Sequence, residues 1–111
     1  MKLELVKHPS DWLSKKLDPW DFDNPPMDPV ELKAEMLKLM KANLGIGLSA
    51  NQVGMDMAVF VIGDGQIDGM QKAFFNPMII GVGDETDSMK EGCLSFPGVW
   101  LMVNRPKQAM I

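Results

Sequence analysis

Cys93 is the only cysteine of the chain and the first residue to consider for chemistry. A cysteine thiolate acts as a nucleophile or a metal ligand, and a nucleophile needs a histidine or another cation beside it. The only histidine, His8, stands far away in the sequence next to Pro9, and no spacing argument brings it to Cys93. A catalytic zinc site takes about three protein ligands, so these two residues are too few. Residue types alone therefore favour a buried small hydrophobe at Cys93, with a thiol enzyme as the alternative.

A glycine pair marks a second segment of interest, residues 45–52, which read Gly-Ile-Gly-Leu-Ser-Ala-Asn-Gln. The pair follows a predicted helix instead of opening one, and it lacks the third glycine and the lysine of a phosphate-binding loop. Gly45 and Gly47 therefore either cap a helix and turn the chain, or allow another backbone to approach closely.

A helix is predicted from about Pro29 to Leu44, and it must position the glycine pair. Asp28 is a suitable N-cap and Pro29 a suitable first residue. Apolar residues recur at three- and four-residue spacing and form one stripe: Leu32, Met36, Leu39, Met40 and Leu44. Gly45 is expected to end the helix in a left-handed conformation. A shorter helix is predicted at 10–17, with Ser10 as its cap.

Short strands are predicted after the glycine pair, and they must position Cys93. The apolar run 57–62 is typical of a strand buried on both faces. Further strands are predicted at 72–75 and 78–82, with turns at 63–69 and 83–88, and weaker strands at 99–103 and 108–111. One long helix followed by short, mostly antiparallel strands indicates a single α+β domain over residues 1–111.

The composition excludes several classes of function. The net charge of −4 and the absence of a lysine and arginine cluster argue against binding to duplex nucleic acid. No apolar run is long enough to span a membrane, and the N-terminus does not resemble a signal peptide. A single cysteine is typical of a reducing compartment. These features predict a soluble, cytoplasmic domain.

The two segments together resemble the first two motifs of the peptide deformylases. The second motif is Glu91-Gly92-Cys93-Leu94-Ser95, followed by Phe96-Pro97-Gly98, and the first is the segment 45–52. The order of helix, glycine pair and strands agrees with the family, as does Phe75-Asn76-Pro77 between the motifs. The resemblance covers nearly the whole chain and implies a deformylase-like α+β fold.

The resemblance also implies a role for each matching residue. Cys93 matches the thiolate ligand of a divalent ion, which is Fe²⁺, with Zn²⁺ or Ni²⁺ as alternatives. The Gln52 side-chain amide and the Leu94 backbone N–H match the two donors that stabilise the oxyanion formed from the formyl oxygen. Gly47 matches a position that pairs with the substrate backbone, and Ile46 and Glu91 match positions around the pocket for the substrate methionine. Glu91 as a solvated turn residue is the competing interpretation.

Three departures from the family pattern stand out. Ser49 replaces an alanine, a small change expected to have little effect. Trp100 occupies a region where some relatives place an arginine that contacts the peptide. Nothing matches the third motif, His-Glu-x-x-His, which supplies two metal ligands and the catalytic base. The domain is therefore expected to lack the C-terminal metal-binding helix, to leave an incomplete metal site, and to expose apolar sheet faces.

The functional expectation is a metal-dependent hydrolase of protein biosynthesis that removes the formyl group from the initiator methionine of nascent peptides during translation. The chain is expected to derive from an active enzyme whose remaining part is missing from it or is a separate polypeptide. The alternative is a non-catalytic remnant that binds a peptide or a partner. The expected partners are N-formyl-methionyl peptides, with self-association or a separate C-terminal partner as a further expectation, and neither nucleic acid nor a membrane.

Overall fold

The computed structural model describes residues 2–63 and 71–111. Apart from Gly63, the turn predicted at 63–69 lies outside the described residues. The helices and strands of the described residues are, in chain order, η1 (Asp11–Ser14), α1 (Pro29–Ala42), β1 (Gly47–Ser49), η2 (Ala50–Val53), β2 (Val59–Ile62), β3 (Lys72–Phe75), β4 (Gly81–Val82), β5 (Thr86–Cys93), β6 (Phe96–Pro106) and β7 (Ala109–Met110). The predicted helix at 10–17 is the shorter 3-10 turn η1, and Ser10 caps it as expected.

Helix α1 forms as its sequence predicts, with one difference at its end. The Asp28 side chain accepts a hydrogen bond from the Val30 N–H at 2.9 Å, which satisfies one of the free amides of the first turn. The prediction that Gly45 takes the left-handed conformation is wrong, because Leu44 has that conformation, with φ 58°. Gly45 instead allows the Leu94 side chain to approach the backbone closely.

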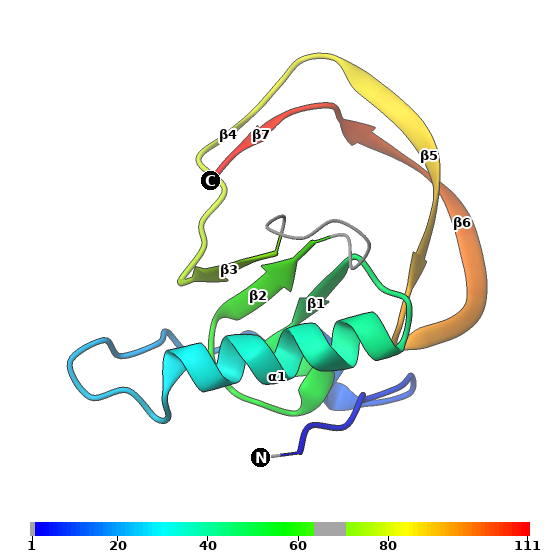
Figure 1. The fold of residues 1–111 in the computed structure, drawn as a ribbon. Coiled ribbons are helices and arrows are strands. Elements are labelled where there is room, and N and C mark those ends of the chain that lie inside the picture. The colour runs from blue at the N-terminus through cyan, green and yellow to red at the C-terminus, as the bar shows by residue number, and fades with distance from the viewer. Residues whose placement is uncertain (1, 64–70) are drawn as a thin grey trace.

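One face of α1 packs on a three-stranded antiparallel sheet in the order β1-β2-β3 (Figure 1). The buried core consists of Trp20, Leu32, Met36, Met40, Leu48, Ala50, Val53, Met57, Val59 and Val61. Strand β2 lies between β1 and β3, but the prediction that both of its faces are buried is wrong. Val59 and Val61 point into the core, whereas Ile62 is 38% exposed. The reason is that α1 covers only one face of this sheet.

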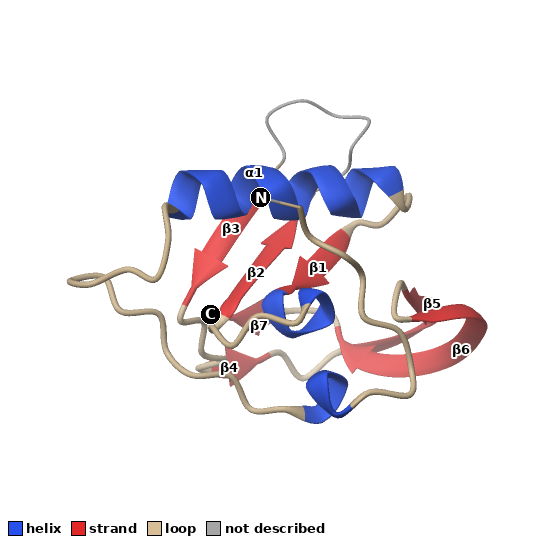
Figure 2. Cartoon of the chain, turned by 90° about the horizontal axis from the view of Figure 1, so that it is seen from below, coloured by secondary structure: helices blue, strands red, loops and turns tan. Residues whose placement is uncertain are grey.

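The C-terminal part forms two further antiparallel pairs, β5-β6 and β4-β7 (Figures 1 and 2). The strand predicted at 78–82 is only Gly81–Val82, and the predicted turn at 83–88 ends early, because β5 begins at Thr86. Strand β5 was missed because its exposed residues are mostly polar and carry no apolar alternation. The strand expected at 99–103 is part of the longer β6, and the strand expected at 108–111 is only Ala109–Met110. The α+β class with antiparallel pairing is confirmed.

Large apolar side chains are exposed along this C-terminal part. They are Met78, Ile79, Ile80, Val82, Met89, Val99, Trp100, Leu101, Met102, Met110 and Ile111. A group of this size is unusual on the surface of a soluble monomer. Among the described residues, no helix is long and apolar enough to cross a membrane.

Candidate functional site

The side chain of Gln52 is held in one orientation by its own turn. Gln52 lies in η2, and its Oε1 accepts hydrogen bonds from the Ser49 N–H at 3.0 Å and from the Ser49 hydroxyl at 3.3 Å. Because the oxygen is engaged on this side, the NH₂ group points the opposite way. The single proton of the serine hydroxyl is shared between Gln52 Oε1 and Asn51 Oδ1. Ser49 therefore supports the orientation of Gln52, and the shorter of its two contacts comes from the backbone N–H, which an alanine would also provide.

The NH₂ group of Gln52 reaches the segment that contains Cys93. Its Nε2 donates to Ser95 Oγ at 3.1 Å and lies 3.4 Å from Cys93 Sγ. Ser95 is fully buried, whereas Cys93 is exposed. The interpretation of Cys93 as a buried hydrophobe is therefore wrong. Residues 41 positions apart in the sequence form one polar cluster here.

Leu94 joins this cluster to the end of α1. Its side chain packs against the core and lies over Gly45. A Cβ atom at Gly45 would stand 2.6 Å from Leu94 Cδ1, closer than van der Waals contact allows. Gly45 is therefore required for a close approach between the helix end and the Cys93 segment. Leu94 is also the residue between Cys93 and Ser95, the two residues that the Gln52 side chain contacts.

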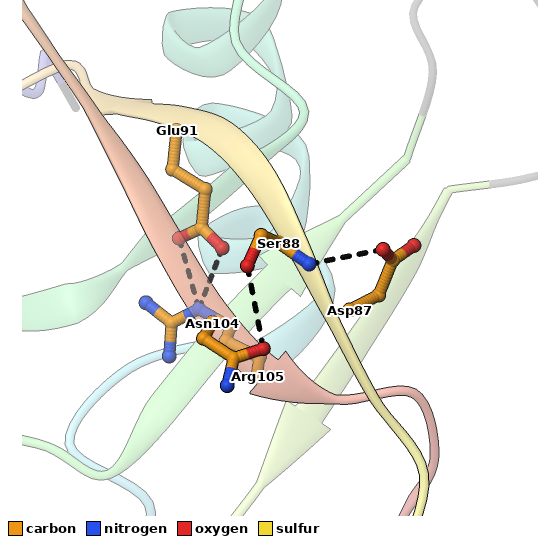
Figure 3. A network of polar contacts seen from close by, with 5 residues as sticks. All are labelled: Asp87, Ser88, Glu91, Asn104 and Arg105. Atoms are coloured by element: carbon orange, nitrogen blue, oxygen red, sulfur yellow. Dashed lines mark hydrogen bonds and ion pairs between the residues drawn. The ribbon is translucent and has the colours of Figure 1, made fainter.

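Glu91 lies on β5 and forms an ion pair with Arg105 of β6 (Figure 3). The Arg105 Nε lies 2.9 Å from Glu91 Oε1 and 2.7 Å from Oε2. Hydrogen bonding to Arg105, with its positive charge, lowers the pKa of Glu91 below its usual value, and the same contact raises the pKa of Arg105. The prediction of Glu91 as a solvated turn residue is wrong, since it is a half-buried residue of a strand.

This ion pair predicts a pH-dependent contribution to stability. The pKa of Glu91 is lower in the folded state, so the contribution is present above the pKa of an unfolded glutamate, about 4.3, and is lost as pH falls through the folded value. We expect Glu91→Gln to lower the thermal midpoint slightly at neutral pH and not at about pH 3. The effect is small because solvent reaches both groups. Thermal melts of wild type, Glu91→Gln and the exposed control Glu4→Gln measure it, and a constant difference across pH would contradict the assignment.

Ile46 and Gly47 directly follow Gly45, the residue that the Leu94 side chain covers. Gly47 begins β1, an edge strand of the sheet, and pairs with Ile62 of β2. Ile46 is 76% exposed, and its carbonyl accepts a hydrogen bond from the Gly63 N–H at 3.0 Å. The glycine pair therefore leads into a strand and does not simply turn the chain. Within the described residues, no strand pairs with the outer edge of β1. An unpaired strand edge is where a further extended backbone can add.

The described residues do not form a metal site by themselves. Within residues 2–63 and 71–111, no group of three or more His, Cys, Asp or Glu side chains lies close enough to hold an ion. Exposed Cys93 is suitable as one ligand. The His8 ring lies near this segment, stacked on Phe96 at 4.7 Å between ring centroids, which no spacing argument predicted. The set is nevertheless too small for a catalytic centre.

Sequence reasoning missed three residues that contact the predicted site residues or their segment. They are Ser95, which accepts the bond from Gln52, Arg105, which pairs with Glu91, and His8, which contacts the segment after Cys93. Ser95 belongs to the quoted motif, so its position was a usable signal. Arg105 and His8 carried no signal, because cross-strand reach and folding of the N-terminus decide their contacts.

The family model described as polypeptide deformylase matches residues 2–111. The chain belongs to the peptide deformylase family. The peptide deformylase of Borreliella burgdorferi is 38% identical over 109 residues, which cover 98% of this chain and 64% of the relative. That of Fusobacterium nucleatum is 38% identical over 77 residues, covering 69% of this chain and 43% of the relative. The chain thus spans less than two thirds of the length of these deformylases.

Solved deformylase structures share the fold. A plant peptide deformylase superposes with a TM-score of 0.84 at 33% identity, over 96% of this chain and 58% of its own. The Thermotoga maritima peptide deformylase superposes with a TM-score of 0.85 at 28% identity, over 98% of this chain and 71% of its own. The deformylase-like α+β fold is therefore shown over nearly all of this chain.

Proposed function

We propose that residues 1–111 form the part of a peptide deformylase that binds the substrate and stabilises the oxyanion. The observation that carries the proposal is the cluster of Gln52 with the Cys93–Ser95 segment, in a chain of this family. The proposed reaction is hydrolysis of the formyl amide of N-formyl-methionyl peptides during translation in the cytoplasm. Water adds to the formyl carbon and the C–N bond breaks. The two products are formate and the peptide with a free amino group on its methionine.

The proposed role of Gln52 and Leu94 is to stabilise negative charge on the formyl oxygen. The oriented Gln52 NH₂ group and the Leu94 backbone N–H are the two donors. Fixed donors avoid reorganisation as charge develops, and each is typically worth about 3 kcal/mol. The contacts from Ser49 to Gln52 support this role, because they orient the amide before substrate arrives.

The proposed substrate path follows the edge of β1. An extended peptide adds to an exposed sheet edge through main-chain hydrogen bonds, and Gly47 leaves room for it. Ile46 and Glu91 are proposed to border the pocket for the methionine side chain. Because Glu91 is held by Arg105 at 2.7 Å, it is proposed to shape the pocket wall and not to contact the reacting atoms.

The proposed metal role of Cys93 is that of a single thiolate ligand. A divalent ion, Fe²⁺, Zn²⁺ or Ni²⁺, would supply an activated water once a complete ligand set holds it. The described residues provide too few ligands. We propose that the remaining ligands and the catalytic base come from polypeptide outside residues 1–111. The same polypeptide is proposed to cover the exposed apolar residues of the C-terminal strands, in one domain with them.

A chimera tests this proposal. The 111-residue chain alone is expected to show no turnover of a formyl-Met tripeptide with Fe²⁺, Ni²⁺ or Zn²⁺ added. Joining it to the part of the Borreliella burgdorferi enzyme that the match leaves uncovered is expected to produce formate. Turnover by the verified 111-residue chain would contradict the claim that residues 1–111 supply too few metal ligands for catalysis. A folded, metal-loaded chimera without turnover would contradict the proposed function.

The alternative, a non-catalytic module that binds peptides, is favoured by one observation, the open edge of β1. Calorimetry with a formyl-Met tripeptide separates the two. Binding heat with the 111-residue chain, combined with an inactive chimera, would support the module. An active chimera supports the enzyme.

A further inference from the structure

The N-terminal segment Val6–His8 contacts both halves of the polar cluster. The Val6 N–H donates to the Gln52 carbonyl at 2.6 Å, and the His8 N–H donates to the Ser95 carbonyl at 2.8 Å. The side chains of Gln52 and Ser95 are themselves hydrogen-bonded at 3.1 Å. Figures 1 and 2 both show the N-terminal segment passing beside the closed end of the β5-β6 hairpin. The backbone amides of positions 6 and 8 thus tie together residues far apart in the sequence.

This segment is held firmly on both sides. Before it, Leu3 and Leu5 pack against the hydrophobic core. At its end, the His8 ring stacks on Phe96, with 4.7 Å between centroids and an interplanar angle of 22°. After it, the Trp12 carbonyl accepts a hydrogen bond from the Asn51 side chain at 3.2 Å. Each anchor connects the segment either to η2 and the core or to the end of the hairpin.

The hairpin needs such a connection, because most of β5 and β6 is exposed and curves away from the core (Figure 1). Near Cys93, the hairpin contacts the rest of the chain through Leu94 on Gly45, through Gln52 with Cys93 and Ser95, and through His8 with Ser95 and Phe96. Catalytic geometry tolerates little error, and a displacement of about 1 Å can cost about a hundredfold in rate.

We propose that Val6–His8 is a positioning segment that sets the separation between Gln52 and Cys93–Ser95, and that the stacking of His8 on Phe96 holds it in place. The ring acts by its flat apolar surface, so a phenylalanine at position 8 should replace it. The inference rests on the proposed function only in treating Gln52 and Cys93 as functional residues. The geometry itself is measurable without any turnover.

Nuclear magnetic resonance on the 111-residue chain tests the proposal with three variants. His8→Ala removes the ring, His8→Phe retains a stacking ring, and Lys7→Ala removes an exposed side chain from the same segment. Two signals are followed: hydrogen exchange of the backbone amides at positions 6 and 8, and the side-chain amide resonance of Gln52. A Gln52→Ala sample identifies that resonance.

We expect His8→Ala to speed exchange at positions 6 and 8 by about three- to tenfold, the range that loss of an aromatic pair implies. The Gln52 resonance should move toward the position of a free glutamine amide. His8→Phe and Lys7→Ala should leave both signals as in the wild type. If His8→Ala does not fold, Phe96→Leu removes the same stacking from the other side and should change both signals in the same direction.

A Gln52 resonance unchanged in His8→Ala, while exchange at position 8 accelerates, would overturn the proposal, because the segment would then be anchored without positioning Gln52. Equal changes in all three variants would also overturn it, since the ring would have no special part. Formate production is not measured, so failure of the proposed function leaves this result unaffected.

Discussion

Gln52→Ala in the chimera described above is expected to lower kcat for a formyl-Met tripeptide by about 10²- to 10³-fold, the usual cost of losing one oxyanion donor. The fall should appear mainly in kcat, because the donor acts on charge that develops after substrate binds. The backbone of η2 should persist, since the bond from Val6 goes to the carbonyl of residue 52 and not to its side chain. Steady-state kinetics with formate detection measures the effect.

The matched control is Gln108→Ala, which removes an exposed glutamine that precedes β7. It should leave kcat and KM unchanged. If Gln52→Ala raised KM alone, Gln52 would be a residue of substrate binding and not a donor to the transition state. A kcat equal to that of the control would remove Gln52 from the mechanism altogether.

Met36→Ala is expected to destabilise the 111-residue chain by about 2–5 kcal/mol, the range for truncating a large buried side chain. Met36 is fully buried on the face of α1 that packs on the sheet, so its removal leaves a cavity. Domains of this size are typically stable by about 5–15 kcal/mol. The loss is therefore a large fraction of the total, and urea denaturation followed by circular dichroism measures it.

Val30→Ala on the same helix is the control, because Val30 is 74% exposed. Its free energy of unfolding should stay within about 0.5 kcal/mol of the wild type. If Met36→Ala unfolded at the same urea concentration as Val30→Ala, α1 would not be the principal support of the sheet. The helix would then not be what holds the glycine pair in position.

The part of the fold near the core could be predicted from local patterns. Asp28, Pro29 and the apolar stripe of α1 indicated the helix, because caps and periodicity act within a few residues. Strand β3 was also found at its expected place. Strand β5 was not, because it lies exposed on the hairpin, and burial is what produces apolar alternation in a strand.

For the candidate site, the residues could be named from the sequence, but the contacts between them could not. The motif residues Gln52, Cys93 and Leu94 were named from the sequence, because they lie in two short segments that resemble a family. That they meet, with Gln52 Nε2 at 3.4 Å from Cys93 Sγ, depends on how Leu94 packs on Gly45. Gly45 was predicted to end the helix in a left-handed conformation, whereas in the structure its lack of a side chain makes room for Leu94.

By itself, the sequence determined the α+β class and the helix with its cap, because these depend on short-range pattern. The family and the motif residues followed from the resemblance of two short segments to deformylase motifs. Only the tertiary structure decided that His8 stacks on Phe96 and that the buried Ser95 bonds to Gln52. It also decided that Arg105 of β6 reaches Glu91 on the neighbouring strand β5. Such contacts join positions far apart in the chain. Their existence depends on the packing of whole elements, which no local pattern of residues specifies.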